Sequence, residues 1–414
     1  MKLLDSKESI KNGKIDYLGE VYMTIILLMV IYVAFIGLGL PDSLFGPAWP
    51  AIYKEFNIPV SFQAFVTMTV TFGTILSSIL SSKIINKVGT RNVVVVSTGL
   101  TVLGLLGFYL SNAFWLLIIS AIPLGIGAGA IDSALNNYVA IHYKQVHMNF
   151  LHCFYGIGVT LSPYIMSMAL STDNNWKKGY MIAFFIQLSI CLILVLSMPL
   201  WNKVKKKNST SSFVTEPIPF NKMIKTTIIV VAGLIFFFYC GIELTTGHWS
   251  ASFLVNAKNI NPDQAAALVG LFYGGLAIGR FTSGLVSTKL SSFKLVFIGE
   301  AILLIACVLF ALPLSGIIYS GIALFLVGFG CGPIFPNMAA ITPTYYGEKY
   351  SQSIMGIQMS LAYTSSITLS PLFGIIGEKI SFKIFPYYIL GFSIILISLS
   401  FVILTLYKSR KQLF

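Results

Sequence analysis

Twelve apolar stretches, each long enough to cross a lipid bilayer, constrain the fold of this chain more than any other feature. They lie at about 21–53, 61–84, 92–112, 113–143, 147–171, 179–201, 224–255, 264–288, 293–312, 315–345, 350–377 and 383–407. A membrane-spanning helix needs about 20 mainly apolar residues, and every stretch reaches that length. Only 10% of the 414 residues are charged, whereas soluble domains carry about 25%. The sequence therefore predicts an all-α membrane protein with twelve transmembrane helices.

The lysine and arginine residues are divided unequally between the two sides of this predicted bundle. Twenty of the 27 lie in the N-terminal tail, the even-numbered loops and the C-terminal tail, six lie on the opposite side, and Arg280 falls within a span. Because cytoplasmic loops carry the excess of Lys and Arg, we expect both termini to be cytoplasmic and the protein to lie in the cell (inner/cytoplasmic) membrane. The net charge of +13 is spread over short loops rather than one face, which argues against a nucleic-acid partner.

A polar linker at 202–223 separates two halves of six predicted spans each. Its Lys, Ser and Thr content is typical of a flexible, solvated segment between domains. The sequence thus predicts a cytoplasmic tail at 1–20, an N-terminal bundle at 21–201, a C-terminal bundle at 224–407 and a second cytoplasmic tail at 408–414.

The second half of the chain repeats the first. Gly125, Gly127 and Gly129 match Gly328, Gly330 and Gly332 at an offset of 203, T-L-S-P at Thr160–Pro163 returns at Thr368–Pro371, and Gly73 matches Gly275. The glycines predict places where neighbouring helices approach closely. Parallel repeats of this kind predict two pseudo-symmetric six-helix bundles.

One carboxylate lies in the middle of the fourth span. Asp132 is followed one helical turn later, on the same face, by Asn136. An aspartate at the centre of a bilayer costs about 2.5–3.5 kcal/mol, so we expect Asp132 to face a polar interior and to serve a function. The alternative is a hydrogen bond between helices. In the second half Phe335 stands in place of Asp132. We therefore expect the N-terminal half to couple transport to the proton and the C-terminal half to contact the apolar surface of the solute.

Three further acids and one base fall within spans, namely Asp42, Glu243, Glu300 and Arg280. Removal of a carboxyl group from water favours its neutral form, so such acids can bind a proton. Asp42 is a candidate for coupling and substrate binding, or else a helix N-cap or kink beside a proline. Glu243, the half-repeat counterpart of Asp42, is a substrate ligand, a second titrating group, or a partner of Arg280 or His248. We expect Glu300 to be packed.

For Arg280 we expect a structural role or a gating ion pair, with substrate contact as the alternative. Neutral polar and aromatic side chains complete the candidate cavity. Amides offer both donors and acceptors, which suits a polyhydroxylated solute. The amide candidates are Asn136, Asn337 and Gln358, and the aromatic candidates are Trp49, Trp249, Tyr155, Tyr273, Phe45 and Phe335. For any single aromatic residue the alternative is packing within the core.

The sequence contains no pattern that indicates an enzyme. No histidine, cysteine and carboxylate cluster has metal-ligand spacing, no nucleophile lies in a catalytic motif, and no glycine-rich loop is suited to phosphate. We therefore expect no metal and no cofactor. The five cysteines lie in apolar segments and are expected to be reduced packing residues.

The segment after the second span carries a resemblance to a known family. It reads S-K-I-I-N-K-V-G-T-R at Ser82–Arg91 and is similar to the signature G-x-L-x-D-R-x-G-R-[RK] of the major facilitator superfamily. Asn86 stands where that signature has aspartate. The resemblance implies the major facilitator fold and a gating role for Gly89 and Arg91.

Within that superfamily the chain resembles the fucose:proton symporter family. The similar stretches are P-D-S-L-F-G-P at Pro41–Pro47, D-S-A-L-N-N at Asp132–Asn137, M-N-F-L-H-C-F at Met148–Phe154, E-L-T-T-G-H-W at Glu243–Trp249 and G-R-F-T-S-G at Gly279–Gly284. The resemblance implies that Asp42 and Asp132 are the coupling and substrate residues. It also implies that Asn149 and His152, in the fifth span, contact sugar.

We therefore expect a monomeric secondary transporter that works by alternating access, driven by a proton gradient and carrying a neutral sugar or related small polar solute. A proton-driven exporter of drugs, metabolites or lipids on the same fold is the alternative. A sensor that does not transport is a third class, which would usually append a signalling domain.

Overall fold

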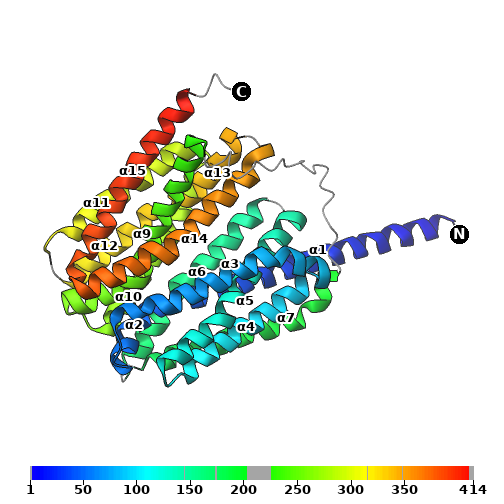
Figure 1. Ribbon diagram of the computed structural model, residues 1–414. Coiled ribbons are helices and arrows are strands. Elements are labelled where there is room, and N and C mark those ends of the chain that lie inside the picture. Colours follow the sequence, from blue (N-terminus) through cyan, green and yellow to red (C-terminus); the bar gives the residue numbers. More distant parts are fainter. Residues whose placement is uncertain are drawn as a thin grey trace.

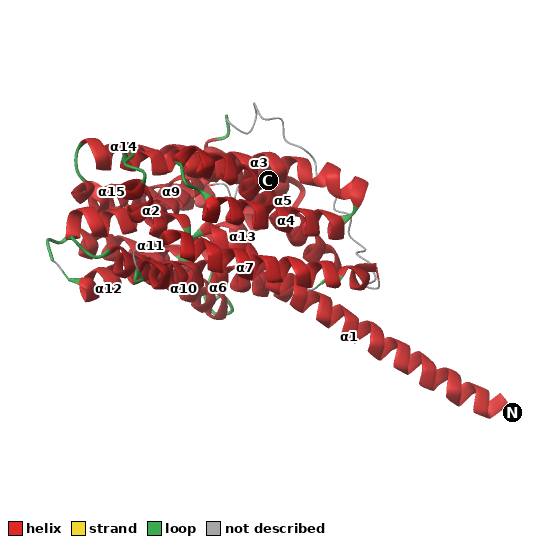
Figure 2. Cartoon of the chain, turned by 90° about the horizontal axis from the view of Figure 1, so that it is seen from below, coloured by secondary structure: helices red, strands yellow, loops and turns green. Residues whose placement is uncertain are grey.

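The computed structural model describes the backbone of residues 2–143, 145–172, 175–202, 225–314, 316–346 and 348–409. Of the expected linker at 202–223, only residue 202 is described, and residues 203–223 lie outside these ranges. Within them, twelve helical stretches are long and apolar enough to cross a membrane, which confirms the predicted number of spans. Figure 1 shows α1–α7 in one bundle and α9–α15 in the other, and Figure 2 shows that the described part of the chain is helices joined by loops.

The bounds of the helices are as follows. The first bundle contains α1 (Lys2–Asp42), α2 (Phe45–Glu55), η1 (Val60–Phe62), α3 (Gln63–Val88), α4 (Thr90–Leu110), α5 (Phe114–His142), α6 (Gln145–Leu170), α7 (Trp176–Leu196) and η2 (Met198–Asn202). The second contains α9 (Thr227–Lys258), α10 (Pro262–Val286), α11 (Ser292–Ala311), α12 (Ile317–Cys331), α13 (Ile334–Tyr346), α14 (Glu348–Lys379), η3 (Phe382–Ile384) and α15 (Phe385–Ser409).

The backbone of α1 is helical from Lys2 onward, so the expected tail at 1–20 and the first span belong to one helix, which projects beyond the bundle (Figure 1). This span then breaks near its middle. Pro41 lies in the last turn of α1, and a short turn follows before α2 begins at Phe45. The N-cap of α2 is Leu44, without a side-chain cap. Asp42 therefore lies at a kink, and the N-cap alternative for it is wrong.

The repeated glycines lie where helices touch. An added Cβ atom at Gly125 would lie 2.2 Å from the carbonyl oxygen of Val70, and one at Gly328 would lie 2.0 Å from that of Phe272. The same alternation holds in both halves: Gly125 and Gly129 face α3 and Gly127 faces α4, while Gly328 and Gly332 face α10 and Gly330 faces α11. The close approach predicted from the glycine pattern is thus confirmed, and each bundle is built on the same contact.

The two bundles meet closely at one end. We call the side of the protein near Tyr22 and Lys408 the terminal side, and the side near Glu55 and Lys258 the distal side. Three side-chain hydrogen bonds join the bundles among the described residues, all in the distal half: Tyr53 Oη to Asn256 Oδ1 (2.9 Å), Ser61 N to Glu378 Oε2 (2.7 Å) and Gln63 Nε2 to the carbonyl of His248 (2.9 Å). The seam between the bundles is therefore closed on the distal side.

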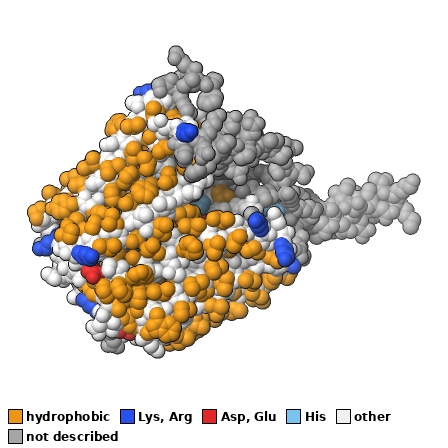
Figure 3. Space-filling model, viewed as in Figure 1, with side chains coloured by type: hydrophobic (Ala, Val, Ile, Leu, Met, Phe, Trp, Pro, Cys, Tyr) orange, Lys and Arg blue, Asp and Glu red, His pale blue; other side chains and the backbone are white. Residues whose placement is uncertain are grey.

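The outer surface matches a lipid environment. On the face seen in Figure 3, apolar side chains cover both bundles, and Lys and Arg lie towards the margins. Large apolar side chains are widely exposed, for example Phe72 (69%), Leu196 (80%) and Ile318 (80%). Exposure of this extent would be unfavourable in water, so the surface belongs against the hydrocarbon of a bilayer.

Candidate functional site

Asp42 faces the interior of the protein but is open to solvent. Its side chain is exposed, although the adjacent Ser43 and Leu44 are 2% and 0% exposed. One carboxylate oxygen accepts a hydrogen bond of 2.9 Å from the hydroxyl group of Tyr155 on α6. Because that bond points towards a neighbouring helix and not towards lipid, the exposed part of Asp42 faces a solvent-accessible space inside the molecule.

Asp132 lies beside the same space. Its carboxylate accepts a hydrogen bond of 2.8 Å from Asn136 Nδ2, which also donates to the Asp132 carbonyl at 3.0 Å. Both bonds lie within α5, and among the described residues Asp132 forms no hydrogen bond to another helix. Asp132 and Asn136 are partly exposed and Asn137 is exposed. Asp132 is close enough to Asp42 for their charges to interact.

In the C-terminal bundle, Glu243 forms an ion pair with Arg280. The guanidinium Nη2 lies 3.2 Å from Glu243 Oε1 and 3.4 Å from Oε2, and the hydroxyl group of Tyr239 also donates to this carboxylate. The side chains of Arg280 and Glu243 are 25% and 19% exposed. Of the alternatives open for Glu243, the partnership with Arg280 is the observed one. His248 instead lies 3.0 Å from the Ser370 hydroxyl group.

Tyrosines connect the charged groups of the two bundles. Tyr155, bound to Asp42, lies within electrostatic range of Arg280 and Glu243, and Tyr273 lies within range of both Glu243 and Asp42. Four charged side chains, from α1, α5, α9 and α10, therefore surround one region at the seam between the bundles.

Tyr363 on α14 is a member of this group that sequence reasoning missed. It lies within electrostatic range of Asp132 and Asp42 and is partly exposed. The repeat contained the signal, because Tyr363 stands at an offset of 208 from Tyr155, the same offset as between Thr160 and Thr368.

His152 lies on α6, almost one turn from Tyr155 towards the terminal side, and is exposed. Its ring packs edge-on against Phe35, with centroids 6.0 Å apart, and it lies within electrostatic range of Arg280. Cys153 is also exposed, so the expectation that every cysteine is a packing residue is wrong at this position. The side chain of Asn149 lies outside the described residues.

Phe335 on α13 packs against Phe236 and Tyr239, with ring centroids 5.3 Å and 6.0 Å apart. Because Tyr239 donates to Glu243, this aromatic cluster borders the ion pair. The C-terminal bundle thus places aromatic rings beside the Glu243–Arg280 pair.

Three expected substrate contacts lie in the core instead. Trp249, Asn337 and Gln358 are 1%, 6% and 1% exposed. Each makes a hydrogen bond that ties two helices together: Trp249 Nε1 to the Ser370 carbonyl (2.8 Å), Asn337 Nδ2 to Ser283 Oγ (2.8 Å) and Thr342 Oγ1 to Gln358 Oε1 (3.1 Å). Each of these side chains is buried and hydrogen-bonded to a neighbouring helix, so in this conformation they stabilise the C-terminal bundle.

Glu300 is packed, as expected from its span. It is 1% exposed on α11 and accepts a hydrogen bond of 2.5 Å from Ser400 on α15. Gly89 has φ of +83° between α3 and α4, a conformation that favours glycine, and Arg91 is partly buried in the first turn of α4. Their expected gating role stays a prediction.

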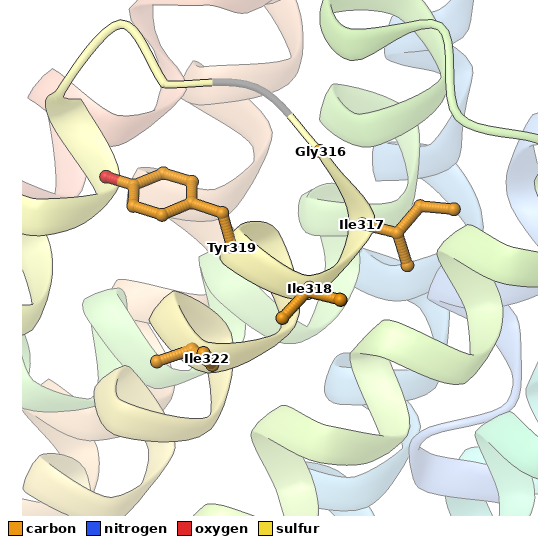
Figure 4. A pocket seen from close by; sticks show the side chains of 5 residues that line it. All are labelled: Gly316, Ile317, Ile318, Tyr319 and Ile322. Atoms are coloured by element: carbon orange, nitrogen blue, oxygen red, sulfur yellow. The ribbon is translucent and has the colours of Figure 1, made fainter.

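A surface pocket elsewhere lacks the chemistry of this centre. Figure 4 shows it at the start of α12, lined by Gly316, Ile317, Ile318, Tyr319 and Ile322. This lining has no charged group, and it lies at the distal end of the C-terminal bundle. Within the described part of the chain, no group of three or more His, Cys, Asp and Glu side chains could hold a metal ion.

Two repeated bundles of membrane-spanning helices, closed against each other at one end around a polar, solvent-accessible centre, define a secondary transporter. A family model described as "Major Facilitator Superfamily" matches residues 31–371 and again residues 231–413. The chain belongs to this superfamily and is a multi-pass membrane transporter.

Similar proteins include several sugar transporters. The "Glucose/mannose transporter GlcP" of Bacillus subtilis is 23% identical over 354 residues, covering 83% of this chain and 86% of the relative. The human "Sodium-dependent glucose transporter 1" is 22% identical over 391 residues, covering 85% and 71%. "Bypass of stop codon protein 6" of Saccharomyces cerevisiae is 22% identical over 413 residues, covering 92% and 82%.

Among solved structures, a variant of the nucleoside transporter NupG superposes with a TM-score of 0.72. The alignment covers 91% of this chain and 98% of that protein, at 11% sequence identity. At this identity the likeness concerns the fold, which is the expected major facilitator fold.

Proposed function

We propose that the protein is a proton-coupled symporter of a neutral sugar or a related small polar solute. The observation that supports this most directly is the state of the two acids in the N-terminal bundle. Asp42 and Asp132 are open to the central space, and neither forms an ion pair with a described residue. A carboxyl group inside a membrane protein that has no counter-ion can be neutralised by taking up a proton. The glucose transporters among the relatives support a sugar as the solute.

In this proposal the carboxylates have two tasks. They accept hydrogen bonds from solute hydroxyl groups, and they release and take up the driving proton as the site changes sides. Asn136 and Tyr155 hold the two carboxyl groups in place. His152, Phe335 and Glu243 complete the proposed binding surface.

The distal closure supports a proposal for the side to which this conformation is open. With the terminal side cytoplasmic, as the distribution of basic residues favours, this conformation is open to the cytoplasm. Rocking of the bundles would break the three distal hydrogen bonds and separate the bundles there. The proposed location is the cell membrane, with a monomer as the working unit.

The test is solute uptake into proteoliposomes under an imposed pH gradient. We expect the wild type to accumulate a hexose, and Asp132→Asn to lose accumulation while it still exchanges labelled for unlabelled hexose. Glu300→Gln is the matched control, since Glu300 is a membrane acid away from the centre. A sodium gradient is a separate arm, because one relative is named sodium-dependent. Uptake that ignores the pH gradient but follows sodium would contradict proton coupling.

Proton-driven export of an amphipathic cargo is the second candidate. The observation in its favour is the partly exposed ring of Phe335 in a centre that also contains the carboxyl groups of Asp42 and Asp132, a combination that attracts hydrophobic cations. A thermal-shift screen separates the two candidates. Stabilisation by hydrophobic cations and not by hexoses would favour export over symport.

A further inference from the structure

Arg280 emerges at the seam where the two bundles begin to separate. At Gly156 on α6, an added Cβ atom would lie 3.5 Å from the Cβ of Ala277, so α6 and α10 are in contact there. Arg280 lies almost one turn further along α10, towards the terminal side. It is within electrostatic range of His152 and Cys153, which are both exposed. The guanidinium group therefore borders the solvent-accessible space opposite the N-terminal bundle.

The ion pair uses only part of this guanidinium group. Nη2 contacts Glu243, which Tyr239 holds in place, so Arg280 is anchored along one edge. Its Nε is itself buried and has no hydrogen-bond partner among the described residues, so the quarter of the side chain that remains exposed belongs to its other atoms. A buried donor without a partner costs about 1–3 kcal/mol. Arg280 thus has hydrogen-bonding capacity that the protein itself does not use.

Glu243 also sets the charge of this group. Because its carboxylate compensates the arginine, the pair is neutral as a unit. Such a pair can donate to a hydroxyl or ring oxygen of a neutral solute, whereas a solute carboxylate would be repelled by Glu243. Asp42 and Asp132 lie across the seam as acceptors for solute hydroxyl groups.

We infer that Arg280 is the solute-binding donor of the C-terminal bundle and that Glu243 makes it selective for neutral over anionic solutes. The identity of that solute as a sugar rests on the proposed function. The protein should therefore discriminate between a hexose and the corresponding uronic acid. The two have the same ring, but the uronic acid carries a carboxylate in place of the CH2OH group of the hexose.

The first experiment measures binding of glucose and glucuronate, and of galactose and galacturonate, to the purified full-length protein. We expect the wild type to bind the hexose at least about 10-fold more tightly than its uronate. In Glu243→Gln the uronate should gain at least about 10-fold relative to the hexose. In Arg280→Gln hexose binding should weaken by about 10- to 100-fold. Glu300→Gln is the control and should change neither ratio.

The double variant Glu243→Gln/Arg280→Gln guards against misfolding. It contains two neutral side chains that can hydrogen-bond each other, and a thermal unfolding curve shows whether it is folded. We expect it to bind hexose weakly, as Arg280→Gln does, and not to show the increased relative affinity for uronate that is expected of Glu243→Gln. Hexose affinity unchanged in Arg280→Gln, or a uronate ratio unchanged in Glu243→Gln, would overturn the inference.

A second experiment needs no substrate. Anionic and cationic methanethiosulfonate reagents are compared for their rates at Cys153, which mass spectrometry of its peptide identifies. If Arg280 faces the space, Arg280→Gln should lower the anionic-to-cationic rate ratio by about 3- to 10-fold, and Glu243→Gln should raise it. An unchanged ratio in both variants refutes the placement of Arg280. If the rate ratio shifts as expected but the protein binds no hexose, the proposal of a sugar as the solute is refuted. The placement of the Arg280–Glu243 pair beside the space is then still supported.

Discussion

The two halves of this transporter share a backbone plan but differ in charge at equivalent positions. Ser78 on α3 and Arg280 on α10 correspond, because Gly73 and Gly275 repeat at the same offset of 202. Ser78 Oγ donates to the carbonyl of Gly129 at 3.1 Å. In the second half, the backbone of Arg280 lies against Gly332, the repeat of Gly129. One half thus uses this position to tie helices, and the other places a cation there.

The fourth span of each half shows the opposite substitution. Asp132 in the N-terminal half corresponds to Phe335 in the C-terminal half. As a result the first bundle has two acids at the centre without a base, and the second has one acid with a base. A shared scaffold with different charges separates two tasks, since an uncompensated acid can exchange a proton while a compensated one stays ionised. We therefore assign coupling to the N-terminal half and fixed hydrogen bonding to the C-terminal half.

The largest expected effect comes from neutralising one acid in each half. Asp132→Asn should reduce accumulation driven by a pH gradient by at least about 100-fold, equivalent to about 2.7 kcal/mol. Glu243→Gln should keep the response to the gradient, because its carboxylate is already compensated by Arg280. The measurement is initial uptake with and without the gradient. Equal loss in both variants would break the division of tasks between the halves.

Breaking the ion pair should have a comparably large effect, on stability and not on coupling. Arg280→Met leaves Glu243 without its counter-ion and should lower the free energy of unfolding by about 3 kcal/mol, the lower end for buried pairs because this pair is partly exposed. Denaturation in mixed micelles measures the change. The double variant Arg280→Met/Glu243→Met should recover more than half of it. If single and double variants are equally unstable, charge compensation is not what the pair provides.

The glycine contacts should show no difference between the halves. Gly125→Ala and Gly328→Ala each place a Cβ atom against a backbone carbonyl and should cost about 1–3 kcal/mol. Gly99→Ala on α4 and Gly391→Ala on α15 are controls, since an added Cβ meets nothing within 4 Å at either site. Unfolding free energies of the four variants provide the comparison. A cost confined to one half would show that the repeat is not preserved in packing.

The smallest expected effect is at Glu300, a packed acid that lies away from the proposed coupling residues. Glu300→Gln retains an oxygen that can accept the hydrogen bond from Ser400. It should change the unfolding free energy by less than about 1 kcal/mol and leave gradient-driven uptake unaltered. A strong loss of uptake in this variant would place a functional acid outside the centre.

The twelve spans and the two bundles could be predicted from the sequence because both depend on local properties. The length of an apolar stretch decides whether it can cross a bilayer. The repeated glycines then predict where a neighbouring helix approaches closely, and the structure bears this out at Gly125 and Gly328. The continuous helix from Lys2 into the first span was not predicted, and the break after Asp42 was predicted only as the kink alternative for that residue.

The site was predictable only where a polar residue had no other reason to lie in a membrane. Asp42, Asp132 and Arg280 are ionisable, so their positions alone marked them as functional candidates. Trp249, Asn337 and Gln358 looked equally suitable but are used in the core, because each found a partner on a neighbouring helix. Which partner a neutral side chain meets depends on helix packing and cannot be read from spacing within one helix.

The sequence by itself determined that the chain crosses a membrane as two related bundles with a few central charges. Both conclusions depend on local properties of each residue, namely its hydrophobicity and the free-energy cost of burying a charge. Only the tertiary structure decided which charges are paired. Glu243 and Arg280 lie on different helices, and whether an acid meets a base or meets water follows from how those helices pack. That pairing, and not the residue type, distinguishes the acids proposed to exchange protons from the acid that compensates the arginine proposed to bind the solute.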